Sequence, residues 1–437
     1  MKKYPKYKSS NIDWIGDIPE HWDIIKLKYL GKTLIGITYS PDNVVNEENG
    51  ILVLRSSNIQ EGYLDFNDCI YVDKNFDKKY YVQEGDILLC ARNGSAHLVG
   101  KSAYIEKINK EITFGAFMTI VRSDLRKYLY YFFNSQVFKS QTGLFSTSTI
   151  NQLTSDTLNN MFISFPKDLE EQTQIINYLE KKILQIDNLI EEKKQLIQLF
   201  EEEKITLISR FTSIGLDPKI EMVNSGVEWM GKIPKHWEIK KLKYLSKVQT
   251  GRTPKIQASN VDFFENGTIN WFTPSDFKSN KEVFKSKRRI TEEAILKNEV
   301  ELFPEKSIYL VSIGATLGKI SYCSTKASAN QQINVISFND KILNPMFGYY
   351  YLIGCKKILL LEADYTTLPI LNQTKTKNLF LVVPPIKEQE KIVNHIELES
   401  KRIDFKIKKT NKLIDLLTEY RSALISEVVT GKVKITD

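Results

Sequence analysis

The chain has 437 residues, of which 42% are hydrophobic and 26% charged. That length and apolar content suit two or three globular domains and exclude a disordered chain. No apolar run approaches the roughly 20 residues of a membrane-spanning helix, and the charged N-terminus lacks the apolar core of a secretory signal. Four widely spaced cysteines, Cys69, Cys90, Cys323 and Cys355, suit reduced thiols rather than a zinc site. We therefore expect a soluble cytoplasmic protein.

The chain repeats itself. The stretch from Trp14 to Leu30 recurs 215 residues later, from Trp229 to Leu245, with 12 of 17 positions identical. A second match joins 162–172 to 380–389: apolar residues, a proline, a short spacer and Glu-Gln, followed by a helical pattern. The sequences between these anchors diverge. We predict two units of about 215 residues, each with an opening motif, a variable body and a long helix.

Each variable body reads as short strands and short helices. The stretches 85–90 and 306–312 are typical of strands that end in glycine-containing turns. The predicted fold class is α/β (α+β): two pseudo-repeated mixed domains joined by two long helices that form an antiparallel coiled coil.

The two long helices give the clearest periodic signal. Apolar residues follow an alternating 3,4 spacing for more than four heptads, which calls for a coiled-coil partner. The predicted seam positions are, in the first helix, Ile176, Leu179, Ile183, Ile186, Ile190, Ile197, Phe200 and Leu207, and in the second, Val393, Ile396, Ile403, Ile407, Ile414, Leu417 and Leu424.

The simplest partner of each helix is the other helix of the same chain. We predict that 168–211 and 390–430 pair antiparallel, each helix being roughly 60 Å long at about 1.5 Å per residue. The structural alternative is a helical hairpin that only packs the chain.

Charge is uneven along the chain, whose net charge is +8. Residues 1–167 carry a surplus of +2 and residues 216–385 a surplus of +8. A basic body suggests a polyanionic partner such as nucleic acid, although solubility explains many basic proteins.

Catalytic motifs are missing. Leu30 to Thr33 resembles the end of a phosphate-binding loop, but Lys26 stands where that motif needs glycine. His21 and His236 are repeat-equivalent and are interpreted as structural, and no serine–histidine–acid or paired-carboxylate arrangement stands out. The pattern favours a binding protein without a catalytic residue or metal of its own.

Several motifs occur in the same order in both halves. They are the paired openings at Trp14 and Trp229, and the strand–turns at 85–101 and 307–319. The others are 146–152 before Pro166 and Glu171-Gln172, Thr366-Thr367 before Pro384-Pro385 and Glu388-Gln389, and the closing stretch 424–432. Together they resemble the specificity subunit of Type I restriction–modification enzymes, over nearly the full length.

The resemblance implies two target-recognition domains, 1–167 and 216–385, each reading one half of a split DNA target. The first conserved coiled-coil helix would occupy 168–215, and the second, with a C-terminal tail, 386–437. It implies assembly with two methyltransferase subunits and two motor–nuclease subunits. S-adenosylmethionine, ATP and Mg are expected on those partners, with methylation on adenine N6. Residues 92–97 of the first copy and 312–317 of the second occupy equivalent positions but differ in sequence. The family pattern is therefore no guide to DNA contacts there.

Candidate DNA contacts follow from side-chain chemistry and loop position. Arginine can read guanine bidentately and asparagine can read adenine, while lysine contacts phosphate. The candidates are Arg55, Ser57, Asn58, Arg92, Asn93, His97 and Lys101 in the first body, and Arg252, Thr273, Ser275, Asp276, Thr316, Lys319, Asn330, Gln331 and Gln332 in the second.

Helix length would act as a ruler between half-sites, which lie about 34–36 Å apart per turn of DNA. Inserting a heptad between Glu191 and Glu203 should lengthen the spacer of the target. The alternatives are a stand-alone DNA-binding protein and a scaffold that binds peptides. Binding to DNA that weakens steeply with salt would exclude the scaffold.

Overall fold

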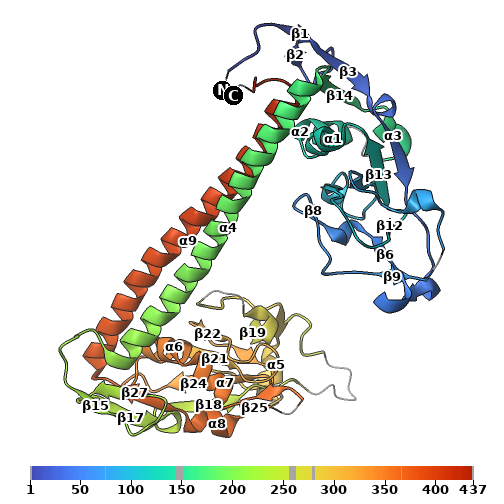
Figure 1. The fold of residues 1–437 in the computed structure, drawn as a ribbon. Helices are drawn as coiled ribbons and strands as arrows, with labels where there is room; N and C mark the ends of the chain where they lie inside the picture. Colours follow the sequence, from blue (N-terminus) through green and yellow to red (C-terminus); the bar gives the residue numbers. More distant parts are fainter. Residues whose placement is uncertain are drawn as a thin grey trace. The chain divides into compact units, whose positions relative to one another are not determined.

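The computed structural model describes residues 2–73, 75–143, 151–254, 262–277, 281–365 and 367–435, without the side chains of 142 and 143. The family motif positions 146–150 and Thr366 lie outside these residues. The chain divides into two compact units: unit 1 is Met1–Lys194 with Asn411–Asp437, and unit 2 is Gln195–Thr410. Each unit contains a mixed body and one segment of each long helix, α4 (Leu169–Ile214) and α9 (Ile386–Val429; Figure 1).

Unit 1 begins with two small antiparallel pairs. They are β1 (Tyr7–Ser9) with β2 (Asp17–Pro19), and β3 (Trp22–Lys26) with β14 (Phe162–Pro166). Trp22 lies opposite Pro166, so the opening motif is held next to the residues that lead into α4. The chain ends nearby, since Lys2 and Lys434 form an antiparallel bridge.

The body of unit 1 contains two four-stranded sheets. The first, of order β11-β10-β13-β4, is antiparallel throughout and consists of β4 (Gly31–Ile35), β10 (Ile87–Cys90), β11 (Ser102–Tyr104) and β13 (Met118–Ser123). The second, of order β12-β6-β9-β5, consists of β5 (Val44–Val45), β6 (Ile51–Leu54), β9 (Tyr71–Val72) and β12 (Ile112–Phe114). Strands β6 and β12 are parallel. The remaining elements are β7 (Ile59–Gln60), β8 (Tyr63–Leu64), α1 (Arg126–Phe133), α2 (Gln136–Gly143) and α3 (Ser155–Asn159).

Unit 2 has the same construction. Its small pairs are β15 (Met222–Asn224) with β16 (Lys232–Pro234), and β17 (Glu238–Lys241) with β27 (Phe380–Val383). One sheet, β18-β24-β21-β22, contains β18 (Ser246–Thr250), β21 (Ser307–Val311), β22 (Ile320–Cys323) and β24 (Ile333–Phe338). The other, β20-β19-β23, contains β19 (Ile269–Phe272), β20 (Arg288–Ile290) and β23 (Ser328–Ala329). The rest are β25 (Asp364–Tyr365), β26 (Pro369–Ile370), α5 (Glu292–Leu296), α6 (Pro345–Gly354), α7 (Lys356–Leu361) and α8 (Gln373–Asn378).

The repeat therefore extends through the bodies, where the sequences diverge. In unit 1, β10 connects to β11 through a turn at Gly100, and in unit 2, β21 connects to β22 through a turn at Gly318. The two glycines have φ of 86° and 83°. Each second sheet has one parallel pair, β6 with β12 and β19 with β23. A mixed fold present twice is thus observed. Topology is maintained by buried apolar strands, which tolerate exchange of one apolar residue for another.

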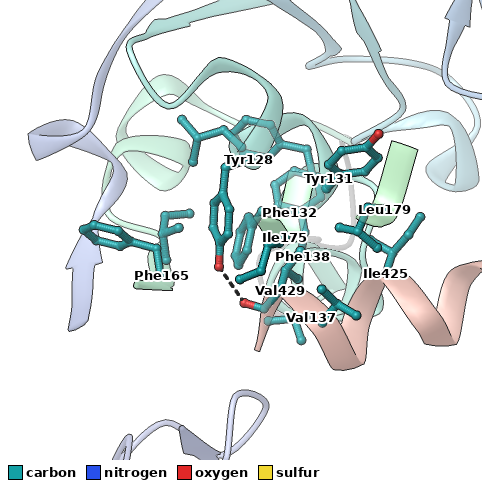
Figure 2. Close-up of a cluster of buried hydrophobic side chains, with 14 of the residues drawn as sticks. Tyr128, Tyr131, Phe132, Val137, Phe138, Phe165, Ile175, Leu179, Ile425 and Val429 are labelled. Carbon is teal, nitrogen blue, oxygen red and sulfur yellow. Dashed lines mark hydrogen bonds between the residues drawn. The ribbon is translucent and has the colours of Figure 1, made fainter. Parts of the chain in front are cut away.

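The core of unit 1 joins its body to its helical segments. Figure 2 shows aromatic residues of α1 and α2, including Tyr128, Phe132 and Phe138, packed with Ile175 of α4 and Val429 of α9. The Tyr128 hydroxyl donates to the carbonyl oxygens of Ser164 (2.9 Å) and Val429 (3.1 Å). Burial raises the pKa of Tyr128, so the phenol stays neutral and keeps donating.

Segments of α4 and α9 pair antiparallel in each unit. In unit 1, Glu171 at the start of α4 and Val429 at the end of α9 both bond to the β3–β14 pair, while Asp187 meets Arg421 further along. In unit 2, Lys204 pairs with Asp404 and the rings of Phe211 and His395 are 4.5 Å apart.

The predicted seam residues differ in burial along the helices. Seven are buried: Leu179, Ile183, Ile186, Val393, Ile396, Ile403 and Leu424. Eight are half-buried: Ile176, Ile190, Ile197, Phe200, Leu207, Ile407, Ile414 and Leu417. The most buried ones lie where a body also covers the helices, because two helices alone cannot enclose a seam.

The compact units do not follow the division predicted from sequence. That division assigns 168–215 and 386–437 to separate helical parts, whereas each compact unit includes segments of both helices. The functional division into recognition domains and helices stays a prediction. Among the described residues, no helix is both long and apolar enough to cross a membrane.

Candidate nucleic-acid interface

The repeated opening motif contacts the start of each long helix. In unit 1, Glu171 accepts hydrogen bonds from Trp22 Nε1 (3.1 Å) and the Tyr4 hydroxyl (2.7 Å), and its Oε2 lies 2.9 Å from His21 Nε2. Gln172 Nε2 donates to the carbonyl of Pro166 at 2.7 Å. These bonds give the repeated Glu-Gln pair and His21 a structural role.

In unit 2 the glutamate of this junction, Glu388, has fewer described side-chain partners than Glu171, whereas Gln389 also bonds to the backbone of Ile342 and Asn344. His236 Nε2 lies 2.7 Å from Glu388 Oε2, and Gln389 Nε2 donates to the carbonyl of Pro384 at 2.8 Å. The buried Trp237 Nε1, however, has no partner among the described residues.

Three loops of unit 1 meet at the carboxyl ends of strands β6, β10 and β12. The backbone N–H of Arg92 donates to the Phe117 carbonyl (3.0 Å), and Asn93 Nδ2 donates to Ser56 Oγ (3.0 Å). The N–H of Asn93 also donates to the Asn151 carbonyl at 3.3 Å. We call these loops, 55–58, 91–97 and 115–117, the unit 1 loop cluster.

Several predicted contact residues build the first of these loops. Asn58 is fully buried; its Oδ1 accepts from the Arg55 N–H, and its Nδ2 donates to the carbonyls of Asp65 and Asp68. Arg55 forms an ion pair with Asp68 at 2.8 Å. Ser57 Oγ is buried without a partner among the described residues. Asn58 thus has no exposed polar atom to offer a base, because its amide shapes the turn.

Other predicted residues of unit 1 are accessible. Arg92 is exposed, and its guanidinium lies 5.2 Å from the ring centroid of Phe117, which is itself 59% exposed. Asn93 is half-buried, with Oδ1 accepting from the Ser95 N–H. His97 and Lys101 line a cavity of about 1020 Å³ within unit 1. Sequence reasoning missed Phe117, because an isolated phenylalanine between strands reads as core.

Unit 2 places an equivalent turn after β19. The Asp276 carboxylate accepts from the N–H (2.8 Å) and hydroxyl (2.9 Å) of Thr273, and from the N–H of Lys287 (2.9 Å). Ser275 Oγ lies 2.9 Å from Thr273 Oγ1. Asp276 is therefore the counterpart of Asn58 and closes the turn with its side chain.

The remaining candidates of unit 2 fall in two neighbouring loops. Gln331, which is exposed, accepts a hydrogen bond from Thr253 Oγ1, while the largely buried Asn330 bonds to Gln332. Arg252 is exposed, 3.7 Å from Glu301.

The turn after β21 contains Thr316 and Lys319. The Lys319 N–H donates to the Thr316 carbonyl, and its Nζ reaches the carbonyl of Phe277 at 3.5 Å. This second contact brings the β21–β22 turn close to the turn that Asp276 closes.

The described residues contain no cluster of three or more histidine, cysteine or acidic side chains suited to a metal ion. The four cysteines are unpaired. The unit 1 loop cluster and the corresponding loops of unit 2 offer hydrogen-bonding groups, cations and exposed rings. Side chains of these kinds can contact the bases and phosphates of nucleic acid.

Comparison with known proteins gives concordant matches over both units. The family model described as Type I restriction modification DNA specificity domain matches residues 19–199 and 234–414. The StySPI specificity subunit of Salmonella potsdam is 22% identical over 432 residues, 95% of this chain and 90% of the relative. The MjaIX specificity subunit of Methanocaldococcus jannaschii is 26% identical over 441 residues, 97% and 96% of the two chains.

A solved structure shares the fold. It is a chain of the structure titled "Structural basis underlying complex assembly and conformational transition of the type I R-M system". The two chains align with a TM-score of 0.68 and 13% identity, over 95% of this chain and 99% of the other.

Proposed function

Because the family model matches most of its length in two copies, the chain belongs to the Type I restriction modification DNA specificity family, and we propose that it selects the DNA sequence on which a restriction–modification complex acts. Each body would read one half of a split target. The chain would carry no catalytic residue itself and would act in the cytoplasm, where the complex meets DNA.

The supporting observation is the use of one scaffold with two different sets of exposed groups. Equivalent turns follow β6 and β19, and both are closed by a polar side chain, Asn58 or Asp276. The groups displayed beside them differ: Arg92 over Phe117 in unit 1, and Gln331 with Thr253 in unit 2. Base sequence is read by such side chains in the grooves, so two different sets suit two different half-sites.

The partners would supply the chemistry. We propose two methyltransferase subunits that bind S-adenosylmethionine and methylate adenine N6, and two motor–nuclease subunits that use ATP and Mg. Both relatives described above are named as specificity subunits of Type I restriction enzymes, and they match along nearly the whole chain. This favours a subunit of such a complex over a stand-alone DNA-binding or scaffold protein.

The test is methylome sequencing of host DNA with and without the gene for this chain. We expect N6-methyladenine at a split motif that disappears on deletion and returns on complementation. An expressed and assembled complex that leaves the methylome unchanged, and whose purified form binds no split target, would overturn the proposal.

A further inference from the structure

Strand β20 lies at an edge of its sheet, and a run of cations begins just before it and continues into it. Lys285, Lys287, Arg288 and Arg289 are all exposed, and no carboxylate within the described ranges pairs with them. They make up half of the +8 surplus of residues 216–385. We call these four residues the β20 cations.

Unit 1 has a strand equivalent to β20. The alignment of the two strands shows which residues of unit 1 stand at the positions of the β20 cations. Strand β9 pairs with β6 through Ile51 and Val72, and β20 pairs with β19 through Ile269 and Ile290. Both residues of the second pair lie 218 positions after those of the first. At this offset, residues 65–73 correspond to 283–291.

The two equivalent segments have opposite charge. Residues 65–73 contain Asp65, Asp68 and Asp73 and no basic residue, whereas residues 283–291 contain the four β20 cations and no acidic residue. Both have an exposed phenylalanine at the same position, Phe66 and Phe284. The strand pairing and the ring are shared, and the charge is opposite; β9 also pairs with β5 on its other side, whereas β20 is an edge strand among the described residues.

The β20 cations lie beside the turn at the end of β19. The N–H of Lys287 donates to Asp276 Oδ1 at 2.9 Å, which ties the segment to the turn that Thr273 opens. Arg288 is held in place, with its guanidinium 3.6 Å from the ring centroid of Phe264 and 5.5 Å from that of Trp271. A cation held on aromatic rings loses less side-chain entropy on binding an anion.

We propose that the β20 cations bind the phosphate backbone of DNA beside the half-site read by unit 2, and that unit 1 has no counterpart. This rests on the proposed function and deepens it. Unit 2 then supplies most of the sequence-independent affinity of the chain, while unit 1 depends more on contacts to bases. Charges on an edge strand also block pairing between molecules, and salt dependence separates that role from binding to phosphate.

The test compares two variants in the methyltransferase complex that contains the full chain. Lys285→Gln, Lys287→Gln and Arg289→Gln are combined, and Arg288 is left in place because it covers Phe264. The matched control combines Lys247→Gln, Lys341→Gln and Lys357→Gln, three exposed lysines elsewhere in unit 2. Both variants lose three positive charges, so an effect of net charge alone is equal in the two.

Binding to a target duplex and to an unrelated duplex is measured over a range of salt concentrations. Each lost phosphate contact reduces the slope of log affinity against log salt by about 0.9, so the first variant should lose a slope of about 3. Affinity for both duplexes should fall by the same factor, and the methylated sequence should stay unchanged. Equal slopes in the first variant and the control would overturn the inference.

Hydroxyl-radical footprinting gives a second readout. The first variant should lose backbone protection beside one half-site only; loss at both, or at neither, contradicts the inference. The single Lys285→Gln variant, with a slope reduced by about 0.9, covers the case in which the triple variant fails to fold. If the unaltered complex shows no preference for any split target, the proposed function fails instead.

Discussion

Asp187 Oδ1 lies 2.9 Å from Arg421 Nε across the helix pair of unit 1, and the same pairing occurs in unit 2 as Asp404 with Lys204 at 2.8 Å. Each residue of one pair lies 217 positions from its counterpart in the other. Lys204 falls at the seam position between Phe200 and Leu207, and Arg421 at the one between Leu417 and Leu424. A polar residue at such a position fixes register and orientation. The two pairs thus define how α4 and α9 align in each unit.

Removing the Asp187 side chain should destabilise the protein more than removing the Asp404 side chain. The Arg421 and Asp187 side chains are 19% and 28% exposed, against 31% and 57% for Lys204 and Asp404. Asp187→Ala leaves a largely buried cation unpaired and should cost about 1–3 kcal/mol, whereas Asp404→Ala should cost under about 1 kcal/mol. Thermal unfolding of the two single variants measures this. Equal destabilisation would show that burial does not decide the strength of the pairs.

The junction glutamates should differ in the same sense. The Glu171 side chain accepts from both Trp22 and Tyr4 and also contacts His21, while the described side-chain bonds of Glu388 include only His236. We expect Glu171→Ala to destabilise unit 1 by about 1–3 kcal/mol, because it orphans two donors, and Glu388→Ala to cost less in unit 2. Amide hydrogen exchange in each unit separates the two effects. A larger loss of protection with Glu388→Ala would refute this ranking.

The thiol of Cys355 should react slowly in the folded protein. Burial raises its pKa to about 12, from the usual value of about 8.5. At pH 8 its thiolate fraction is then about a thousandfold lower than that of an unfolded cysteine. Because the folded pKa is raised, the thiol's contribution to stability is present below the unfolded pKa and is lost as pH rises through about 12.

Alkylation followed by mass spectrometry checks this at several pH values. Labelling of Cys355 should increase about tenfold per pH unit below about 12. Denatured protein is the control, in which Cys355 should label as quickly as Cys69. Fast labelling of Cys355 at pH 8 in the folded protein would contradict the prediction.

The spacing of the target should follow the length of the helix pair. Because α4 and α9 pair antiparallel, a heptad must be added to both, between Asp187 and Lys204 and between Asp404 and Arg421. Seven residues add about 10 Å of helix, or about three base pairs at 3.4 Å each. Methylome sequencing of the double insertion should show a spacer longer by that amount. An active variant with the original spacer would refute the ruler.

A heptad in α4 alone is the control. It shifts seam residues such as Ile183 against their partners, so we expect lost activity without a new spacer. A single insertion between Glu191 and Glu203 is therefore not sufficient, because the two paired helices must lengthen together.

The sequence predicted the long helices and the repeated junction motifs, because both are encoded by patterns of residues close together in the chain. The 3,4 spacing gave the long helices, and the repeat gave Trp22, His21 and Glu171 as a set, although not the bonds among them. The sheets could not be predicted in detail, since strands such as β6 and β12 are far apart in sequence and pair in parallel. Sequence also could not show that Asn58 is buried in a turn or that Phe117 is exposed beneath Arg92.

The β20 cations are visible in the sequence as a local cluster, but the net charge of the whole body does not identify them. That sum does not reveal a run of four cations within five residues. Its meaning emerges only from the strand pairing that sets 283–291 against 65–73.

The most direct test of the central claim replaces one body with the other. The variant chain has residues 31–159 (from β4 to the end of α3) in place of residues 246–378 (from β18 to the end of α8). Both units then carry the same loops, while the junctions and helices are unchanged. Methylome sequencing of cells with this chain should show two copies of the first half-site and no trace of the second. A methylated motif that still contains the second half-site would contradict the claim that each body reads its own half.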